Sequence, residues 1–429
     1  MLFGIFSFII MRHYDNITQL VDHLFRHESG KMVAVLTRLL GMQQLETAQD
    51  IVQDTLLQAM STWSYNGLPE NPKGWLYRVA RNKAIDHLRR HKRFRELVPH
   101  YGYLLESEWA LSSTMHQLFL ENEIQDSQLR MMFACCHPSI QPESQVALTL
   151  KTLGGLSVNE VARAFLTSDD TISKRIYRAK EKIKAEKIEL DVPAGNELPA
   201  RLDAVIKSLY LLFNEGYNSS HPEQLIREDL CYEAMRLCKL LTEQPVTAFP
   251  RVKALLSLMC FQSSRLGSRL DDKGNIILLK YQDRSKWYRP LIQKGFDYLD
   301  ASSEPFEISV YQLEAAIASL HAASPSFEAT NWKRIHFLYQ LLYQLQPNPV
   351  VALNKAIASA YVLGKEEALD ALMQIKGLEH HHLYHASIGE LQFELKNSAL
   401  AKKHFEKALS LAPSLPEQSL LLSRVALCK

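Results

Sequence analysis

The sequence lacks most features that mark secreted, membrane-spanning or disulfide-bonded proteins. Its 429 residues contain only six cysteines, and no two form a C-x-x-C pair, so no disulfide framework is predicted. An apolar run, MLFGIFSFII, covers residues 1–10. It is too short to span a bilayer and has neither the basic start nor the cleavage site of a secretory signal. These absences favour a reducing compartment, and we predict a cytoplasmic protein.

Residues 1–10 need an interpretation of their own. Met11 follows the apolar run, and polar sequence begins there. We interpret residues 1–10 as a start-site artefact or an apolar tail. An interfacial membrane anchor is the alternative.

Strong charge of one sign and familiar catalytic motifs are also absent. The net charge is only +2, so binding to a nucleic acid would have to come from local basic patches. The chain has no G-x-S-x-G, no P-loop, no H-E-x-x-H and no convincing pair of carboxylates. We therefore predict that the protein is not an enzyme and needs no cofactor or metal. The alternative is an active site on a concave surface of the C-terminal part.

Short β-branched runs bounded by turns are nearly absent, whereas helix formers dominate, so we predict an all-α fold. Charge and turn signals divide the chain into a tail (1–10), a helical domain (11–95), a linker (96–128), a second helical domain (129–190) and a long helical remainder (191–429). The last boundary falls at the proline- and glycine-containing segment that starts at Asp191.

A strongly basic helix is predicted within residues 71–95. Asn71-Pro-Lys-Gly74 opens it as a turn signal, and apolar residues then recur every three or four positions. The apolar stripe is Leu76, Val79, Ala80, Ala84 and Leu88, and the basic side chains around it include Arg78, Arg81, Lys83, Arg89, Arg90, Lys92, Arg93 and Arg95. This excess of charge is suited to a polyanion. The alternative is a solvated basic face on an ordinary helix.

Three helices are predicted before this one. Residues 16–40 are expected to form two helices, which end at Gly41. Residues 45–63 form the third, whose apolar face repeats at spacings of three and four. Its other face carries Gln49, Asp50, Gln53, Asp54 and an exposed Leu57. Such a row is either a solvated surface or a docking face for a partner helix.

A helix-turn-helix pattern follows the linker. Ser157-Val-Asn-Glu160 matches a capping box for a helix over 158–165, and residues 166–168 form a turn. A basic helix is predicted over 170–187, capped by Ser168 or Asp169. This layout is typical of DNA-binding proteins, and a plain helical hairpin is the alternative. Just upstream, Cys135-Cys-His-Pro138 is predicted to be a buried pair of small residues rather than a metal site, because no second ligand pair lies nearby.

Residues beyond 191 read as consecutive helices joined by short loops. Small, aromatic and proline residues near the C-terminus match the pattern of a tetratricopeptide repeat, namely Gly389, Ala401, Phe405, Ala408 and Pro413. Ala356, Ala368 and Leu372 occupy the corresponding places one repeat earlier. We therefore predict an α-solenoid, in which stacked helix pairs bury a continuous core.

Taken together, these motifs resemble a known family. AQDIVQDTLLQAMSTW (48–63), NPKGWLYRVARNKAIDHLRRHKR (71–93) and GGLSVNEVARAFLTSDDTISKRIYRAKEKI (154–183) are similar to regions 2 and 4 of extracytoplasmic-function (ECF) sigma factors of the sigma-70 family. LYLLFNEGY (209–217), YQDRSKW (281–287) and NPVVALNKAIA (348–358) resemble the subgroup with a C-terminal tetratricopeptide-type domain. The similarity covers nearly the whole chain from Met11.

The resemblance implies a sigma factor that binds core RNA polymerase and directs initiation at promoters. The resemblance assigns contact with the β′ clamp coiled coil to Asp50, Gln53, Asp54 and Leu57. It implies that the −10 element is captured with one base flipped out of the non-template strand. The residues assigned to this step are Trp75, Arg78, Arg81, Asn82, Arg89, Arg90 and Arg93. Reading of the −35 element falls to Thr171, Ser173, Lys174, Arg175 and Arg178.

One departure from the family pattern affects the −35 assignment. Asp169 and Asp170 open the recognition helix, where a glycine or neutral residue is more usual in the family. Acids at this place cap a helix well but repel phosphate.

The C-terminal domain is expected to tune the activity, through contact with region 2, region 4, the polymerase or a protein partner. The alternative for the whole chain is a helix-turn-helix regulator on a tetratricopeptide-like scaffold, independent of polymerase.

Overall fold

A computed structural model describes residues 17–90, 117–165, 167–219, 225–303 and 308–428. It divides into two compact units, Met1–Leu212 and Phe213–Lys429. Within the described ranges every regular element is a helix, and the single β-type feature is an isolated bridge between Leu270 and Ile276. The predicted all-α class is therefore confirmed.

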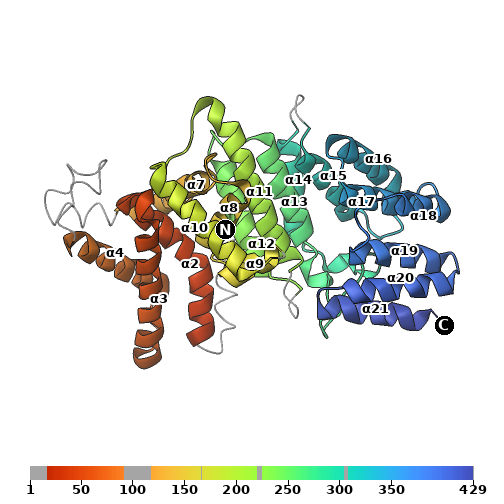
Figure 1. The fold of residues 1–429 in the computed structure, drawn as a ribbon, viewed down its shortest axis with the longest axis horizontal. Helices are drawn as coiled ribbons and strands as arrows, with labels where there is room; N and C mark the ends of the chain where they lie inside the picture. Colours follow the sequence, from red (N-terminus) through yellow and green to blue (C-terminus); the bar gives the residue numbers. More distant parts are fainter. Residues whose placement is uncertain (1–16, 91–116, 166, 220–224, 304–307, 429) are drawn as a thin grey trace. The chain divides into compact units, whose positions relative to one another are not determined.

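The first unit begins with three helices, α2 (Ile17–Leu40), α3 (Leu45–Asn66) and α4 (Pro72–Arg90), which pack on one another (Figure 1). Their shared core contains Leu36, Ala48, Trp63, Leu76 and Leu88, all of which are almost fully buried. The apolar faces predicted for α3 and α4 are the faces that pack inward, although Val79 is only half-buried and Ile85 is buried as well.

Residues 17–40 form one helix, so the prediction of two helices was wrong. Gly30 lies inside α2, where a glycine normally weakens a helix. A Cβ atom at Gly30 would lie 2.6 Å from the carbonyl oxygen of Leu153. The glycine therefore allows a distant backbone segment to approach the helix and does not interrupt it.

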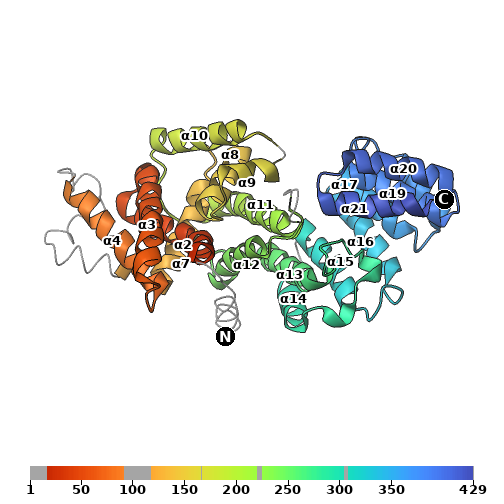
Figure 2. The same cartoon turned by 90° about the horizontal axis from the view of Figure 1, so that it is seen from below.

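The first unit continues with α7 (Glu121–Cys135), α8 (Pro142–Thr152), α9 (Val158–Ala164) and α10 (Asp169–Ala185), and it reaches into α11 (Leu198–Tyr217). Helix α10 packs across α8 and α9 (Figure 2). Helix α7 packs on α2, and Arg38 of α2 makes ion pairs of 2.9 and 3.0 Å with Glu123 and Asp126 of α7.

The Cys135-Cys136 pair lies at the buried end of α7. The Sγ atom of Cys136 is 3.6 Å from Thr149 Oγ1 and 3.9 Å from Ser208 Oγ, and burial raises the pKa of this thiol to about 11. Arg201 donates a hydrogen bond of 2.7 Å to the carbonyl of Phe133. These contacts join α7, α8 and α11, so the pair is part of a core. The described residues hold no group of three His, Cys, Asp or Glu side chains placed to bind a metal.

The second unit consists of consecutive helices, as predicted for the residues beyond 191. They are α12 (Glu228–Glu243), α13 (Pro250–Ser263), α14 (Arg289–Ala301), α15 (Val310–Ala323), α16 (Trp332–Leu345), α17 (Pro349–Ser359), α18 (Lys365–Met373), α19 (His382–Glu394), α20 (Ser398–Leu411) and α21 (Leu415–Leu427). From α15 onward each helix packs on the next one in sequence. No helix in the described part of the chain is long and apolar enough to cross a membrane.

Two irregular segments of the second unit, 271–275 and 281–287, are held by side-chain hydrogen bonds. Within residues 281–287, Arg284 is buried and donates hydrogen bonds of 2.7 and 2.9 Å to the carbonyls of His321 and Ser324, while Trp287 is buried beside it. The turn at 271–275 is closed by Asp271, whose Oδ1 accepts from the backbone amides of Lys273 and Asn275. Both sets of hydrogen bonds therefore fix the irregular chain between α13 and α14.

The small residues of the predicted repeat lie where helices meet. Gly389 of α19 faces α20, and a Cβ atom added to it would lie 2.8 Å from ring atoms of Phe405. Ala401, Phe405 and Ala408 are buried on α20, and Ala356, Ala368 and Leu372 are buried one repeat earlier. Close packing at these points agrees with a tetratricopeptide-like arrangement, which stays a prediction.

Candidate nucleic-acid and partner interfaces

The outer face of α3 carries the row predicted to dock on a partner. Asp50, Gln53, Asp54 and Leu57 are all exposed, and Leu57 leaves 57% of its surface open to solvent. In the described part of the chain, neither aspartate is in an ion pair. Met60, one turn beyond, is also exposed. An acidic row beside exposed apolar side chains is suited to a basic partner helix with an apolar stripe.

The first turn of α3 is already occupied by the end of α10. Glu46 accepts from Lys184 at 2.9 Å and lies 3.6 Å from Lys180, which donates to Gln49 at 2.8 Å. The hydrogen bond that Lys184 donates to Glu46 lowers the pKa of Glu46 and raises the pKa of Lys184. This contact leaves Lys180 half-buried. The free part of the α3 face therefore begins at Asp50.

Helix α4 starts earlier than predicted. Residues 71–74 were expected to form a turn, but the helix begins at Pro72, and the Oδ1 atom of Asn71 accepts from the amide of Gly74 at 2.8 Å. Proline suits the first position of a helix because its φ is already fixed and its missing N–H is not needed there. The asparagine therefore caps the helix, and the preceding loop leads directly into it.

The predicted −10 residues lie at different depths on α4. Arg78, Asn82 and Arg89 are exposed, whereas Trp75 and Arg81 are half-buried. The Trp75 ring meets the buried ring of Trp63 edge-on, with centroids 5.3 Å apart. Arg89 is 3.7 Å from Asp86. The side chain of Arg90 and the whole of Arg93 lie outside the described residues.

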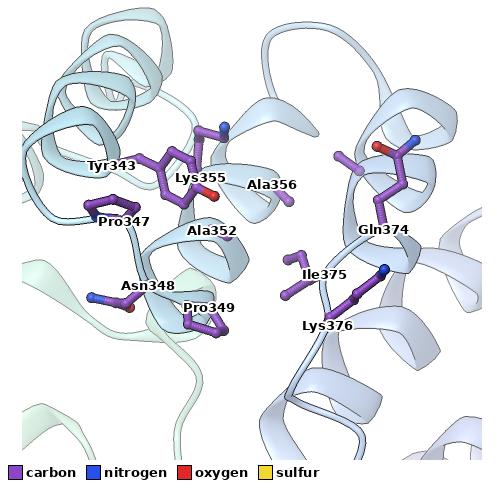
Figure 3. Close-up of a pocket in the computed structure, with 11 residues that line it drawn as sticks. Tyr343, Pro347, Asn348, Pro349, Ala352, Lys355, Ala356, Gln374, Ile375 and Lys376 are labelled. Atoms are coloured by element: carbon purple, nitrogen blue, oxygen red, sulfur yellow. The ribbon is translucent and has the colours of Figure 1, made fainter.

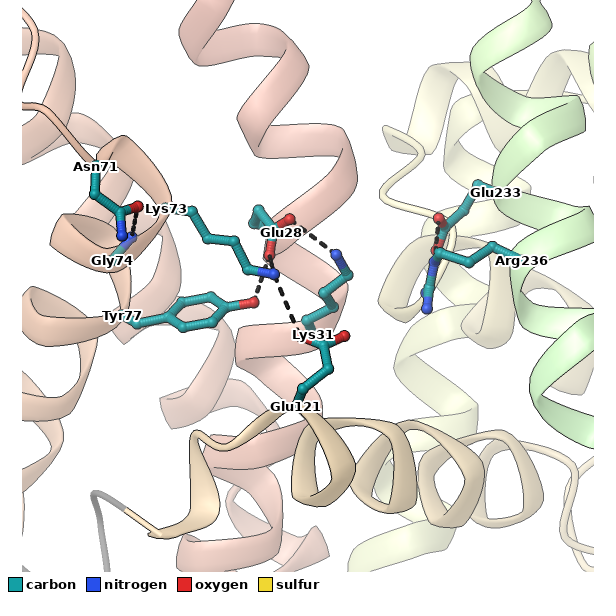
Figure 4. A network of polar contacts seen from close by, with 9 residues as sticks. All are labelled: Glu28, Lys31, Asn71, Lys73, Gly74, Tyr77, Glu121, Glu233 and Arg236. Atoms are coloured by element: carbon teal, nitrogen blue, oxygen red, sulfur yellow. Dashed lines mark hydrogen bonds and ion pairs between the residues drawn. The ribbon is translucent and has the colours of Figure 1, made fainter. Parts of the chain in front are cut away.

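A buried carboxylate that sequence reasoning missed fixes the start of α4 to α2. Glu28 of α2 is 6% exposed, accepts from Lys31 at 2.8 Å and from the hydroxyl of Tyr77, and lies 3.9 Å from Lys73 (Figure 4). Burial raises the pKa of Glu28, but the two lysines and the tyrosine outweigh it, so the net pKa is lowered. The sequence signal that could have identified Glu28 is an acidic residue on an otherwise apolar face of a helix.

The helix-turn-helix prediction agrees with the local geometry of α9 and α10. The Ser157 hydroxyl accepts from the Glu160 amide at 3.2 Å and the Glu160 carboxylate accepts from the Ser157 amide at 2.7 Å, which confirms the capping box. Ser168 is the cap of α10, because its hydroxyl accepts from the Thr171 amide. The inward face of α10 consists of Ile172, Ile176, Ala179 and Ile183, which recur every three or four residues and are buried.

The predicted −35 residues are not equally available on α10. Ser173, Lys174 and Arg178 are exposed, while Thr171 and Arg175 are half-buried. Lys174 pairs with Asp170 at 2.6 Å, and the Arg175 guanidinium lies over the Phe165 ring at 5.6 Å.

Two further residues, Asp169 and Tyr177, lie beside these −35 candidates on α10. Asp169 accepts from the side chain of Asn159 at 3.2 Å, so both acids that open α10 are engaged by polar neighbours. Tyr177, which is 62% exposed beside Arg178, was missed. Its spacing of four residues from Ser173 could have placed it on the same face.

Family models match separate stretches of the chain. Sigma-70 region 2 matches residues 24–94, Sigma-70 region 4 matches residues 130–183, and a family of unknown function (DUF6596) matches residues 201–303. The first match contains α3 and α4, and the second contains α9 and all but the last two residues of α10. No solved structure matches the chain.

Curated relatives fall into two kinds. An uncharacterized protein of Rhizobium meliloti is 36% identical over 91% of this chain and 92% of its own length. The ECF RNA polymerase sigma-E factor of Haemophilus influenzae is 30% identical over 36% of this chain and 80% of its own length. The ECF RNA polymerase sigma factor SigE of Mycolicibacterium smegmatis is 26% identical over 38% of this chain and 60% of its own length.

The matched domains and their helix geometry define a DNA-binding transcription protein. The chain belongs to the ECF RNA polymerase sigma factors of the sigma-70 family. Regions 2 and 4 are the parts through which such a factor acts in transcription initiation, and they imply core RNA polymerase and promoter DNA as its partners. The similarity to named sigma factors covers little more than a third of the chain, and the R. meliloti protein shares the remainder as well.

Proposed function

We propose that this sigma factor holds core polymerase through the α3 face, opens the −10 element with α4 and reads the −35 element with α10. The roles follow the family resemblance residue by residue. The exposed row on α3 is the observation that carries the proposal, because DNA binding alone gives no reason for it. Asp50, Gln53, Asp54 and Leu57 would meet the β′ clamp coiled coil.

The −10 assignment is supported by the kinds of side chain that lie at the start of α4. Arg78 is exposed and suited to a phosphate, and Asn82 lies one turn further along with an amide that can pair with an unstacked base. Trp75 offers a ring whose orientation is fixed by Trp63. On α10, Ser173, Arg178 and Tyr177 supply the exposed side chains for the major groove.

The second unit would tune this activity and would not catalyse a reaction. Its tetratricopeptide-like helices form the kind of surface that binds proteins, either region 2 or 4 of the same chain, the polymerase, or another partner. A regulatory domain in the same chain would take the place of a separate membrane-bound anti-sigma protein. The factor would act in the cytoplasm, where its polymerase is.

Run-off transcription with core polymerase tests the proposal. The full-length protein should support initiation on a promoter with spaced −35 and −10 elements, and core polymerase alone should not. The Q53A/D54A variant should lose roughly tenfold or more of its affinity for core polymerase, because it removes one amide hydrogen bond worth about 0.5–1.5 kcal/mol and one hydrogen bond to a charged group worth about 1.5–3 kcal/mol. Glu406→Gln, which changes an exposed acid on α20, is the matched control.

A promoter-duplex binding assay without polymerase separates a sigma factor from a helix-turn-helix regulator that works without polymerase. A regulator would bind promoter duplex alone, and Q53A/D54A would leave that binding unchanged. Transcription that is equal with and without the protein would contradict the proposal.

A further inference from the structure

A pocket of about 470 Å³ lies within the second unit. The end of α16 and the first turns of α17 form one wall, and the segment that follows α18 forms the other (Figure 3). Its volume is in the range of small-molecule sites, and it is too small for a folded partner. Neither region 2 nor region 4 contributes to it, so sigma activity does not explain it.

The charged residues that line the pocket are all positive. Lys355 of α17 and Lys376 after α18 are the charged residues of its lining, and the lining includes no carboxylate. Among the described residues, neither lysine forms an ion pair. Lys355 is half-buried, with its ammonium 4.5 Å from the ring centroid of Tyr343. Two cations without a counter-charge at one cavity favour an anion there.

A neighbouring histidine lies close enough to Lys355 to be affected by its charge. His336 lies two turns before Tyr343 on α16. Burial lowers the pKa of His336, and the charge of Lys355 lowers it further.

The rest of the lining is apolar or amidic. Pro347, Pro349 and Ile375 supply apolar surface, and Asn348 and Gln374 supply amides. The Oδ1 atom of Asn348 accepts from the amide of Val351 as the cap of α17. Its NH₂ group and that of Gln374 would act as donors. The surface therefore combines cations, donors and apolar walls, which together suit an amphiphilic anion.

We propose that this pocket binds a small organic anion, whose carboxylate or phosphate lies between Lys355 and Lys376 and whose apolar body lies against the prolines and Ile375. Such a ligand would contact both α17 and the segment after α18, which supply lining residues of the pocket drawn in Figure 3. The proposal concerns binding alone, so it stands or falls separately from the role in transcription.

Three naphthalene probes test the proposal by calorimetric titration of the full-length protein. These are 2-naphthoate, 2-naphthyl phosphate and the neutral 2-naphthamide, each in buffer of equal ionic strength. At least one anion should bind saturably, one per chain and about tenfold or more tighter than the amide, because hydrogen bonds to charged groups are worth about 1.5–3 kcal/mol. The stronger of the two anions identifies a carboxylate or a phosphate site.

Variants and chemical labelling locate the binding. The K355Q/K376Q variant should lose about tenfold or more of the anion affinity and keep that for the amide. Lys333→Gln, an exposed lysine on α16 outside the pocket, should bind as the wild type does. In the unmodified protein, the bound anion should slow acetylation of Lys355 and Lys376 but not of Lys333, as measured by mass spectrometry.

Several results would overturn the proposal. One is the failure of both anions to bind saturably at millimolar concentration. Another is equal affinity of the amide and the acids. Equal acetylation of the two pocket lysines with and without a bound anion would also overturn it, even if K355Q/K376Q failed to fold.

Discussion

Trp75 is the residue on which the −10 assignment depends most. Its ring meets Trp63, which is fully buried in the core of the first unit, at an interplanar angle of 65°. An aromatic ring held in this way loses little conformational freedom when it contacts a base. The residue predicted for strand capture is therefore fixed before DNA arrives, whereas the exposed Arg78 and Asn82 can adjust.

The buried carboxylate of Glu28 offers a stability test at the same scale. Glu28→Gln should cost about 1–3 kcal/mol in the free energy of unfolding of the first unit, because it weakens the contacts to Lys31, Lys73 and Tyr77. The folded-state pKa of Glu28 is below its ordinary value of 4.5, so the carboxylate stabilises above about pH 4.5 and the effect is lost as pH falls. Urea unfolding at pH 7 and pH 4 should show the difference between wild type and variant shrinking at the lower pH.

Glu121→Gln is the matched control for this test. Glu121 also contacts Lys73, at 3.4 Å, but it is largely exposed, so its removal should change stability by less than about 0.5 kcal/mol. A Glu28→Gln penalty that did not shrink at pH 4 would contradict the assigned role of the carboxylate.

At the level of elements, the spacing of apolar residues correctly predicted which face of a helix is buried. The four buried positions of α10 and the apolar faces of α3 and α4 follow from spacing alone, because a helix buries one face. Gly30 could not be interpreted in this way, since its reason is the backbone of Leu153, far away in sequence. The same holds for Lys180, whose partner Gln49 belongs to another helix.

For the site residues, too, the sequence predicted exposure but not side-chain pairing. Helical spacing placed Asp50, Asp54 and Arg178 on exposed faces. It could not show that Lys174 is paired with Asp170 or that Arg175 lies over Phe165. Pairing depends on the exact direction of side chains, which a spacing rule does not contain. The roles of these residues in binding stay predictions.

The contact between α19 and α20 gives a prediction about packing. Gly389→Ala would bring a methyl group within 2.8 Å of the buried Phe405 ring, and we expect a loss of about 1–3 kcal/mol from overpacking. Urea unfolding of the full-length protein, followed by circular dichroism, measures this loss.

Gly267→Ala is the control, since a Cβ atom there would meet no atom within 4 Å. It should change stability by no more than about 0.5 kcal/mol in either direction. Equal effects of the two substitutions would show that close packing is not the reason for the glycine at 389.

For the whole molecule, the position of α11 decides how the chain can be divided. The first unit ends at Leu212, inside α11, whereas the sequence predicts a boundary at 191. Leu202, Val205 and Leu209 are fully buried, and Arg201 holds the carbonyl of Phe133.

We therefore expect a truncation after Leu190 to melt at a much lower temperature than one after Tyr217. The shorter chain loses at least three buried aliphatic side chains, each worth about 1.5–3 kcal/mol. Thermal unfolding by circular dichroism compares the two, and equal melting temperatures would support the boundary at 191. Run-off transcription with the more stable truncation, beside the full-length factor, then measures whether the C-terminal part inhibits or activates.

Most of the positive charge on α10 is paired with carboxylates of the same chain. Each of its four lysines, Lys174, Lys180, Lys182 and Lys184, has a carboxylate within 4 Å, so the chain supplies their counterions itself. Among the described residues, Arg175 and Arg178 have no such carboxylate. Promoter binding by region 4 would then displace few ions from the DNA, with a slope of about −1.8 in log affinity against log salt if these two arginines alone neutralise phosphates. Such a factor would hold its −35 contacts through changes in cellular salt that would release a more openly basic helix.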